Sequence, residues 1–319
     1  MEFFKKETRI DFMGIRFYTG IVIVVLWIIS IGLLWTKGLN FGLDFTGGTQ
    51  VEARFQTEVS PVDIRMQLEK EGFQGVRVQH YGSTQDILIR SKGESVVIDS
   101  VKDKAEPTSE QRLSTHIKKV LLDHYPKVEI RRTEFVGSEV GSELVERGII
   151  AVIVAVFGTM LYIIFRFEYR LAISAALGLV HDAFLIMGVF SLFGFEFDLA
   201  ALASVLAVLG YSLNDTIVVF DRVRENFRKV RKGSPVEVMN LSINQTLSRT
   251  LMTSWMTLLV VLALLFFGGE TLFGFSMAFF LGIIIGTFSS IYVSGAVALW
   301  LGLSRDDLLP KAKVEFEGP

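Results

Sequence analysis

The sequence predicts a polytopic α-helical membrane protein with six transmembrane helices and one α/β domain outside the bilayer. Of its 319 residues, 50% are hydrophobic, 27 are Phe, and the mean hydropathy is +0.46. Uncharged segments long enough to cross a bilayer recur along the chain, and a polar stretch, 37–146, separates the first of them from the rest. The formal net charge of −2 gives no reason to expect a nucleic-acid partner.

The first apolar segment, 17–36, follows a short basic N-terminus, 1–16, that we expect in the cytoplasm. The apolar run is longer than the hydrophobic core of a signal peptide, and no small-residue cleavage site follows it. It therefore predicts an uncleaved first transmembrane helix.

The polar stretch 37–146 is predicted to fold as one domain. Strand-like alternation at 49–56 is followed by a helix at 61–70 that Ser60 and Pro61 begin. We then expect strands at 76–80 and 86–90, a helix at 108–123 and a last strand at 128–135. The order β-α-β-β-α-β is that of the ferredoxin-like fold. The segment 93–105 is an insertion without an assigned place.

Five further spans are predicted within 147–303, at 148–165, 171–193, 199–220 and 250–267, with the sixth inside 272–303. The connection 221–248 and the turn at Arg166 and Arg170 are basic, whereas the short loops 194–198 and 268–271 contain no Lys or Arg. By the positive-inside rule, both termini and the tail 304–319 are cytoplasmic, and the domain is extracytoplasmic. The basic run 222–232 predicts an amphipathic helix that meets anionic lipids, or less strongly a docking surface for a protein.

The span 199–220 carries Asn214 and Asp215. A carboxylate within a membrane helix costs roughly 2.5 kcal/mol or more, so it usually faces a partner or a wet path. The i+4 series Ala203, Ala207, Tyr211 places Asp215 on the small-residue face of this helix. Two interpretations follow. Asp215 is either a structural polar contact between helices or a proton-binding site, because desolvation favours the neutral acid.

Other polar residues within the spans are candidates as well. Arg249 has a depth that matches Asp215, so the two predict an ion pair; Arg249 alone would be an anchor that reaches the headgroups. Thr253 continues the face of Arg249. His181 and Asp182 predict a buried hydrogen-bonded contact between helices or, less strongly, a proton relay. The chain has no cysteine, no i, i+4 histidine pair, no phosphate loop and no nucleophile elbow, so we expect neither enzyme activity nor a metal or organic cofactor.

Two long motifs resemble the SecF family of the bacterial Sec accessory complex: FGLDFTGGTQVE at 41–52 and LGYSLNDTIVVFDRVRENFRK at 209–229. Shorter motifs support it: LVHD (179–182), QTLSRT (245–250), FGGETLFGFS (267–276) and IGTFSSIYV (285–293). The resemblance covers nearly the whole chain.

The resemblance implies half of an RND-type transporter in the bacterial inner membrane, with SecD as the other half. The pair would use the proton-motive force to promote preprotein movement through, and release from, the SecYEG channel, with protons as the coupling ion. It implies that Asp215, beside Asn214, and Arg249 serve proton movement, and that residues 41–49 couple the domain to the first span. Within 41–49, the stretch that contains Asp44, Gly47, Gly48 and Thr49 predicts a hinge, or alternatively a rigid turn.

Two other classes of function remain open. An RND-like exporter of lipids or small solutes would share the intramembrane acid, and a scaffold would use Asp215 only for structure. Crosslinking of an unfolded polypeptide to residues 50–135 distinguishes these classes from a translocation subunit.

Overall fold

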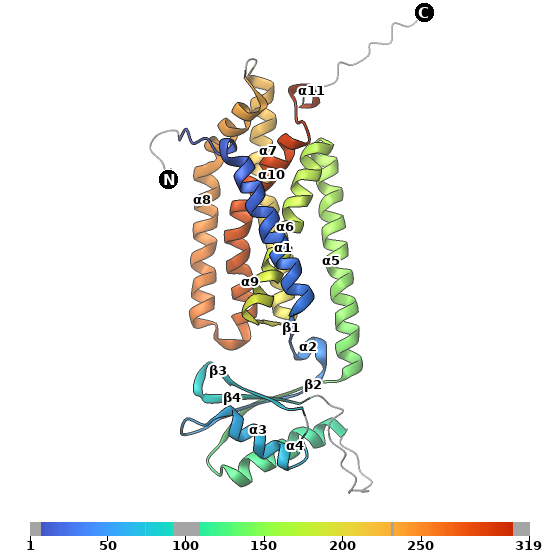
Figure 1. Ribbon diagram of the computed structural model, residues 1–319, viewed down its shortest axis with the longest axis vertical. Coiled ribbons are helices and arrows are strands. Elements are labelled where there is room, and N and C mark those ends of the chain that lie inside the picture. Colours follow the sequence, from blue (N-terminus) through green and yellow to red (C-terminus); the bar gives the residue numbers. More distant parts are fainter. Residues whose placement is uncertain (1–7, 74, 92–108, 231–232, 309–319) are drawn as a thin grey trace, which may run out of the picture.

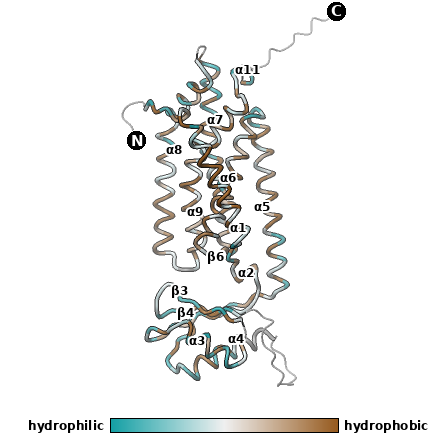
Figure 2. Tube along the Cα trace, viewed as in Figure 1, coloured by the Kyte–Doolittle hydropathy of each residue, from teal (hydrophilic) through white to brown (hydrophobic). Residues whose placement is uncertain are grey.

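The protein consists of a helical bundle with a small α/β domain at one end (Figure 1). The structure is a computed structural model that describes residues 8–73, 75–91, 109–230 and 233–308. The first and last described segments both lie at the end of the bundle opposite the domain. Figure 2 shows apolar residues along the length of the bundle, whereas the domain and the opposite end carry most of the hydrophilic ones.

Within the described residues, six helical spans are long and apolar enough to cross a membrane, which confirms the predicted number. The chain is thus a multi-pass membrane protein. The helices are α1 (Arg16–Thr36), α5 (Ser138–Arg166), α6 (Tyr169–Phe193), α7 (Leu199–Lys229), α8 (Pro235–Phe267) and α9 (Gly269–Phe288). The last span continues through a π-helical turn, η2 (Ser289–Val293), into α10 (Ser294–Trp300). A 3-10 turn, η1 (Met13–Ile15), precedes α1, and α11 (Arg305–Leu308) follows the bundle.

Three helices extend beyond the spans that hydropathy predicted. The connection predicted at 221–248 is largely helical, because α7 continues to Lys229 and α8 already begins at Pro235. Ser234 begins α8 with a capping box: its hydroxyl accepts the Glu237 N–H, and the Glu237 carboxylate accepts the Ser234 N–H. On the other side, α5 begins at Ser138, within the stretch predicted to belong to the domain.

The domain has the predicted β-α-β-β-α-β order. Its elements are β2 (Gly48–Arg54), α3 (Pro61–Lys70), β3 (Arg77–Tyr81), β4 (Ser83–Ser91), α4 (Ser109–His124) and β5 (Glu129–Val136). The antiparallel sheet has the order β3-β4-β2-β5, as in a ferredoxin-like fold. Helices α3 and α4 cover the face of the sheet away from the bundle (Figure 1), around buried residues such as Val51, Ile64, Ile89 and Ile117. The predicted insertion 93–105 lies outside the described residues.

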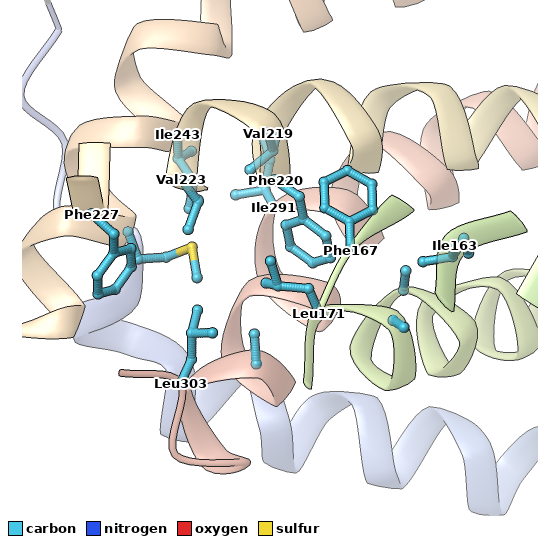
Figure 3. Packing of buried hydrophobic residues seen from close by; sticks show 14 of the residues in the cluster. Ile163, Phe167, Leu171, Val219, Phe220, Val223, Phe227, Ile243, Ile291 and Leu303 are labelled. Carbon is cyan, nitrogen blue, oxygen red and sulfur yellow. The ribbon is translucent and has the colours of Figure 1, made fainter. Parts of the chain in front are cut away.

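A large apolar cluster holds the bundle together at the end distant from the domain. Figure 3 shows Ile163 and Phe167 packed near Leu171, with Phe220 beside them. The rings of Phe167 and Phe220 meet edge to face, with centroids 6.1 Å apart. This cluster joins α5, α6, α7 and α8, so it fixes the helices on which the polar residues of the bundle lie.

The junction between α1 and the domain contains two short elements that the sequence did not predict. β1 (Asn40–Phe41) pairs in parallel with β6 (Glu196–Phe197), and α2 (Leu43–Thr46) follows at once. Gly47 then turns the chain with φ 64°, and a Cβ at this position would lie 2.8 Å from the Cα of Ser138. The glycine turn is therefore packed against the start of α5 in this structure.

We predict that Gly47→Ala destabilises the protein more than Gly38→Ala does. Both glycines have φ near 70°, where alanine costs roughly 1 kcal/mol, but only Gly47 has backbone atoms against the added Cβ, whereas Gly38 has nothing within 4 Å. The measurement is the thermal unfolding midpoint of each purified variant in detergent. Equal losses for the two variants would contradict the close packing at Gly47.

Candidate functional site in the membrane bundle

Asp215 lies inside the bundle, with only 2% of its surface exposed. Its Oδ1 accepts a hydrogen bond of 3.4 Å from the hydroxyl of Thr253 on α8. Its Oδ2 is buried and has no hydrogen-bond partner among the described residues. The Thr253 hydroxyl also lies 2.9 Å from the carbonyl oxygen of Thr250 and 3.2 Å from that of Arg249. A hydroxyl has one hydrogen to donate, so the carboxyl group of Asp215 is weakly satisfied.

Further hydroxyl groups surround this carboxyl group and connect three helices. The hydroxyl of Tyr211 on α7 donates to Ser254 of α8 at 3.3 Å, and Ser254 lies 2.8 Å from the hydroxyl of Thr287 on α9. The site around Asp215 is therefore a network of hydroxyl groups between α7, α8 and α9, which is the kind of lining that can carry a proton or a water molecule.

The predicted direct ion pair between Asp215 and Arg249 is not formed. No nitrogen–oxygen distance of 4.0 Å or less joins these two described residues, and Arg249 is exposed on the surface of the bundle. Thr253, one turn after Arg249 on α8, is the residue that contacts the Asp215 side chain instead.

Asn214 points away from Asp215. It is exposed on α7, together with the small residues Ala203, Ala207 and Gly210. The i+4 spacing predicted Asp215 on this small-residue face; the structure instead turns Asp215 inward, toward Thr253, and leaves Ala203, Ala207 and Gly210 exposed. An exposed amide in the middle of a membrane helix is costly in lipid. This face is therefore suited to packing against another helix.

His181 and Asp182, both buried on α6, contact two different helices. The indole N–H of Trp27 on α1 donates to His181 Nδ1 at 2.8 Å, and the hydroxyl of Ser212 on α7 donates to Asp182. Each residue thus forms a contact between helices, which is the first of the two roles that the sequence predicted for them.

At the outer end of the bundle, the candidate hinge contacts the start of α7. The Asp44 carboxylate accepts the Leu199 N–H at 3.1 Å, and Asp198 caps the same helix by accepting the Ala201 N–H at 2.7 Å. Burial raises the pKa of Asp198; the Ala201 N–H opposes this, and the nearby charges of Glu196 and Asp44 add to it. Thr49 is fully buried at the start of β2.

Two further contacts join the sheet to the bundle. Arg90 of β4 forms an ion pair with both carboxylate oxygens of Glu196, and its Nε donates to Gln50 at 2.7 Å. Arg132 of β5 donates to the Thr271 hydroxyl of α9 at 3.2 Å. A cavity of about 480 Å³ lies between the sheet and the bundle, and Glu52, whose pKa is raised by burial, is part of its lining. These contacts hold the domain against the nearby ends of α7 and α9.

These features define a class: a multi-pass membrane protein in which a buried, weakly satisfied carboxyl group lies on a helix that an outer α/β domain contacts. Comparison with known proteins makes this specific. Residues 116–304 match the family "Protein export membrane protein SecD/SecF, C-terminal", and residues 32–59 match the "SecD/SecF GG Motif". The second match contains Asp44, Gly47, Gly48 and Thr49.

Curated relatives agree over nearly the full chain. The protein translocase subunit SecF of Pseudomonas aeruginosa is 46% identical over 96% of this chain and 95% of its own length. SecF of Vibrio alginolyticus is 45% identical over 98% of this chain and 96% of its own length. SecF of Escherichia coli O157:H7 is 42% identical over 97% of this chain and 92% of its own length. The chain belongs to the SecF family of protein translocase subunits.

Solved structures of SecDF resemble the chain as well. The crystal structure of SecDF from a Thermus species superimposes with a TM-score of 0.82 at 34% identity, over 93% of this chain and 39% of that one. The crystal structure of SecDF in its super-membrane-facing form gives a TM-score of 0.67 at 36% identity, over 94% of this chain and 40% of that one. This chain therefore spans about two fifths of those longer chains.

We predict that Arg90→Ala broadens the range of positions of the domain relative to the bundle, because it removes the ion pair to Glu196. The chain has no cysteine, so spin labels on cysteines introduced at Asp63 and Phe267 report one domain-to-bundle distance. Arg65→Ala is the matched control, since it breaks only the exposed pair with Glu69 within α3. An Arg90→Ala distance distribution as narrow as that of the control would contradict the role of this pair.

Proposed function

We propose that the chain works with SecD in the bacterial inner membrane, where the pair uses the proton-motive force to promote preprotein translocation through, and release from, the SecYEG channel. Membership of a family of translocase subunits supports transport of polypeptides over export of lipids or small solutes. The observation that carries the use of protons is Asp215, a buried carboxyl group with one unpartnered oxygen among hydroxyl groups.

Proton binding at Asp215 would change the packing of α7. The ionised form needs donors or a cation, and the structure supplies one shared hydroxyl and an Arg249 that is not in contact. Protonation removes the charge and with it the attraction to Arg249, so α7 and α8 would prefer a different spacing. One proton that crosses 100 mV yields about 2.3 kcal/mol, enough to bias two packings of similar free energy.

Movement of α7 would reach the outer domain through contacts at its start. Asp44 binds the Leu199 N–H, and Glu196, in the strand just before α7, binds Arg90 of the sheet. We propose that the domain follows α7 and engages the emerging preprotein. In this view residues 41–49 transmit the motion as a packed element, and the flexibility lies in the polar contacts around it.

We propose that SecD covers the small-residue face of α7. The solved structures that the chain resembles are named SecDF and are longer than this chain, which leaves room for a second membrane half. We also propose that both termini face the cytoplasm and that basic residues near the end of α7, such as Arg228 and Lys229, meet anionic lipids.

Asp215→Asn should abolish stimulation of translocation by an imposed pH gradient, because the amide keeps the volume of the side chain but cannot bind and release a proton. The measurement uses reconstituted vesicles that contain the chain with SecD and SecYEG. Asp221→Asn is the control: it lies on the same helix, is partly exposed and pairs with Arg166 at 2.9 Å. Normal stimulation in the Asp215→Asn vesicles would reduce Asp215 to a structural contact.

Gly210→Leu should prevent co-purification with SecD, because a large side chain would separate two helices that meet at this face. Gly158→Leu is the matched control. Both glycines are exposed on membrane helices and have nothing within 4 Å of an added Cβ, but Gly158 lies on α5. If Gly210→Leu retains SecD as well as Gly158→Leu does, the small-residue face is not the contact surface.

A further inference from the structure

Asp182, in the middle of α6, is a second carboxyl group inside the bundle, and the function proposed above does not use it. Its exposure is 0%, against 2% for Asp215, so both are buried. The Ser212 hydroxyl donates to its Oδ2, whereas its Oδ1 is buried without a partner among the described residues. Within the described part of the chain, no lysine or arginine forms an ion pair with it.

The groups that face Asp182 are nearly all neutral. Ser212 faces it from α7 and Ser289 from η2. His181, its neighbour on α6, accepts the Trp27 indole N–H at Nδ1, and an imidazole nitrogen that accepts carries no proton, so this ring is uncharged. Asp215 lies three residues beyond Ser212 on α7. An ionised Asp182 would thus be a desolvated charge with only hydroxyl groups to stabilise it, and a neutral one carries a proton that it can release.

The helices around Asp182 are closely packed. A Cβ added to Gly286 would lie 3.1 Å from the Ser212 side chain and 3.6 Å from Asp182 Oδ2. A Cβ added to Gly178, one turn before Asp182, would lie 2.6 Å from the Ser294 hydroxyl. Neither glycine can be replaced by a larger residue without a shift of its neighbours. A change of charge at Asp182 would therefore act directly on the helices packed around it.

The last span is irregular at the same point. Its π-helical turn, η2, begins at Ser289, whose hydroxyl lies 3.4 Å from the Gly178 carbonyl of α6. Single π turns occur frequently at functional sites, where they interrupt the regular hydrogen bonding of a helix. The backbone of η2, beside Asp182, can therefore form either π-helical or regular α-helical hydrogen bonds.

The surroundings of Asp182 and of Asp215 share two elements. On α7, Ser212 contacts Asp182, and Asp215 follows within one turn. On the last span, Thr287 bonds to Ser254 in the Asp215 network, and the Ser290 hydroxyl of η2 donates to the Thr287 carbonyl at 3.0 Å. A rearrangement at either carboxyl group therefore reaches the other through α7 and through η2.

We propose that Asp182 is a second proton-binding residue of the bundle, which exchanges its proton as Asp215 does and sets the packing of η2. The exchange is balanced: the carboxyl group takes a proton from water and returns it to water, with no other bond made or broken. The inference rests on the proposed function in that the two carboxyl groups act in one cycle. Its test includes a readout that does not depend on translocation.

The test is a pH titration by infrared difference spectroscopy of the full chain with SecD in lipid vesicles, which detects the C=O band of a protonated carboxylic acid. We expect a band that titrates, is absent in Asp182→Asn and persists in Asp215→Asn. Ser212→Ala should shift this band, because it removes the donated hydrogen bond but keeps the carboxyl group. In the same vesicles with SecYEG, Asp182→Asn should lose stimulation by a pH gradient while it still assembles with SecD.

Each other result overturns the proposal. A band that does not titrate makes Asp182 a permanently neutral structural acid, and a band that titrates in a chain whose Asp182→Asn variant translocates normally makes its proton irrelevant. If Asp182→Asn does not assemble, Ser212→Ala decides: an unchanged pH profile of translocation overturns the proposal. Failure of the proposed function is seen separately, as normal stimulation in Asp215→Asn, whatever the Asp182 band does.

Discussion

The rest of the structure depends on the burial of acidic side chains among hydroxyl groups, without a cation in contact. Lipid offers no water to satisfy a carboxylate, so its charge has to be met by protein or removed by a proton. A charge inside a membrane helix costs roughly 2.5 kcal/mol or more, and a proton that crosses 100 mV yields about 2.3 kcal/mol. These magnitudes are similar. In the function that we propose, a single proton at Asp215 would therefore be enough to decide between two packings, whereas a strong ion pair with Arg249 would hold one of them.

The polar contacts between the domain and the bundle are weak enough for the small free energy of one proton to change them. Arg90 and Glu196 keep 19% and 27% of their side chains exposed, and ion pairs with this access to water contribute little, about 1 kcal/mol at most for fully exposed ones. The contacts of Asp44 and Arg132 are single hydrogen bonds to the bundle. Together they fix the posture of the domain above α7 and α9, yet no single one would be difficult to break. The opposite end of the bundle is held by a large apolar cluster as well.

Hydropathy predicted the six spans because a helix that crosses lipid needs a long apolar stretch, and such stretches are visible in the sequence. The order of strands and helices in the domain followed from alternation and from the start signals Ser60 and Pro61. Hydropathy could not show that α7 and α8 continue beyond the membrane, since polar helices carry no such signal. The capping box at Ser234 and Glu237 was readable in the sequence and would have located the start of α8.

Other features depend on contacts between distant residues. The pairing of Asn40 with Glu196 joins two strands of two residues each, too short for any periodic pattern. The i+4 spacing on α7 identified the faces of that helix, but spacing alone does not show which face a neighbour covers, so Asp215 was assigned to the wrong one. The depth of Arg249 was likewise compatible with a direct pair, but depth does not show which face of α8 a residue occupies: Thr253 contacts Asp215, whereas Arg249 is exposed.

The contacts of Thr253 support the proposed switch at Asp215 over a permanent contact. Its one hydroxyl hydrogen has three acceptors within reach, two of them carbonyl oxygens of its own helix. When Asp215 is ionised, the hydrogen is drawn to the carboxylate, because a bond to a charged acceptor is the stronger one. When Asp215 is neutral, the hydrogen would return to the backbone of α8, and this one hydrogen bond between α7 and α8 would be lost. In the function that we propose, the proton would thus decide a hydrogen bond of the helix that the domain contacts.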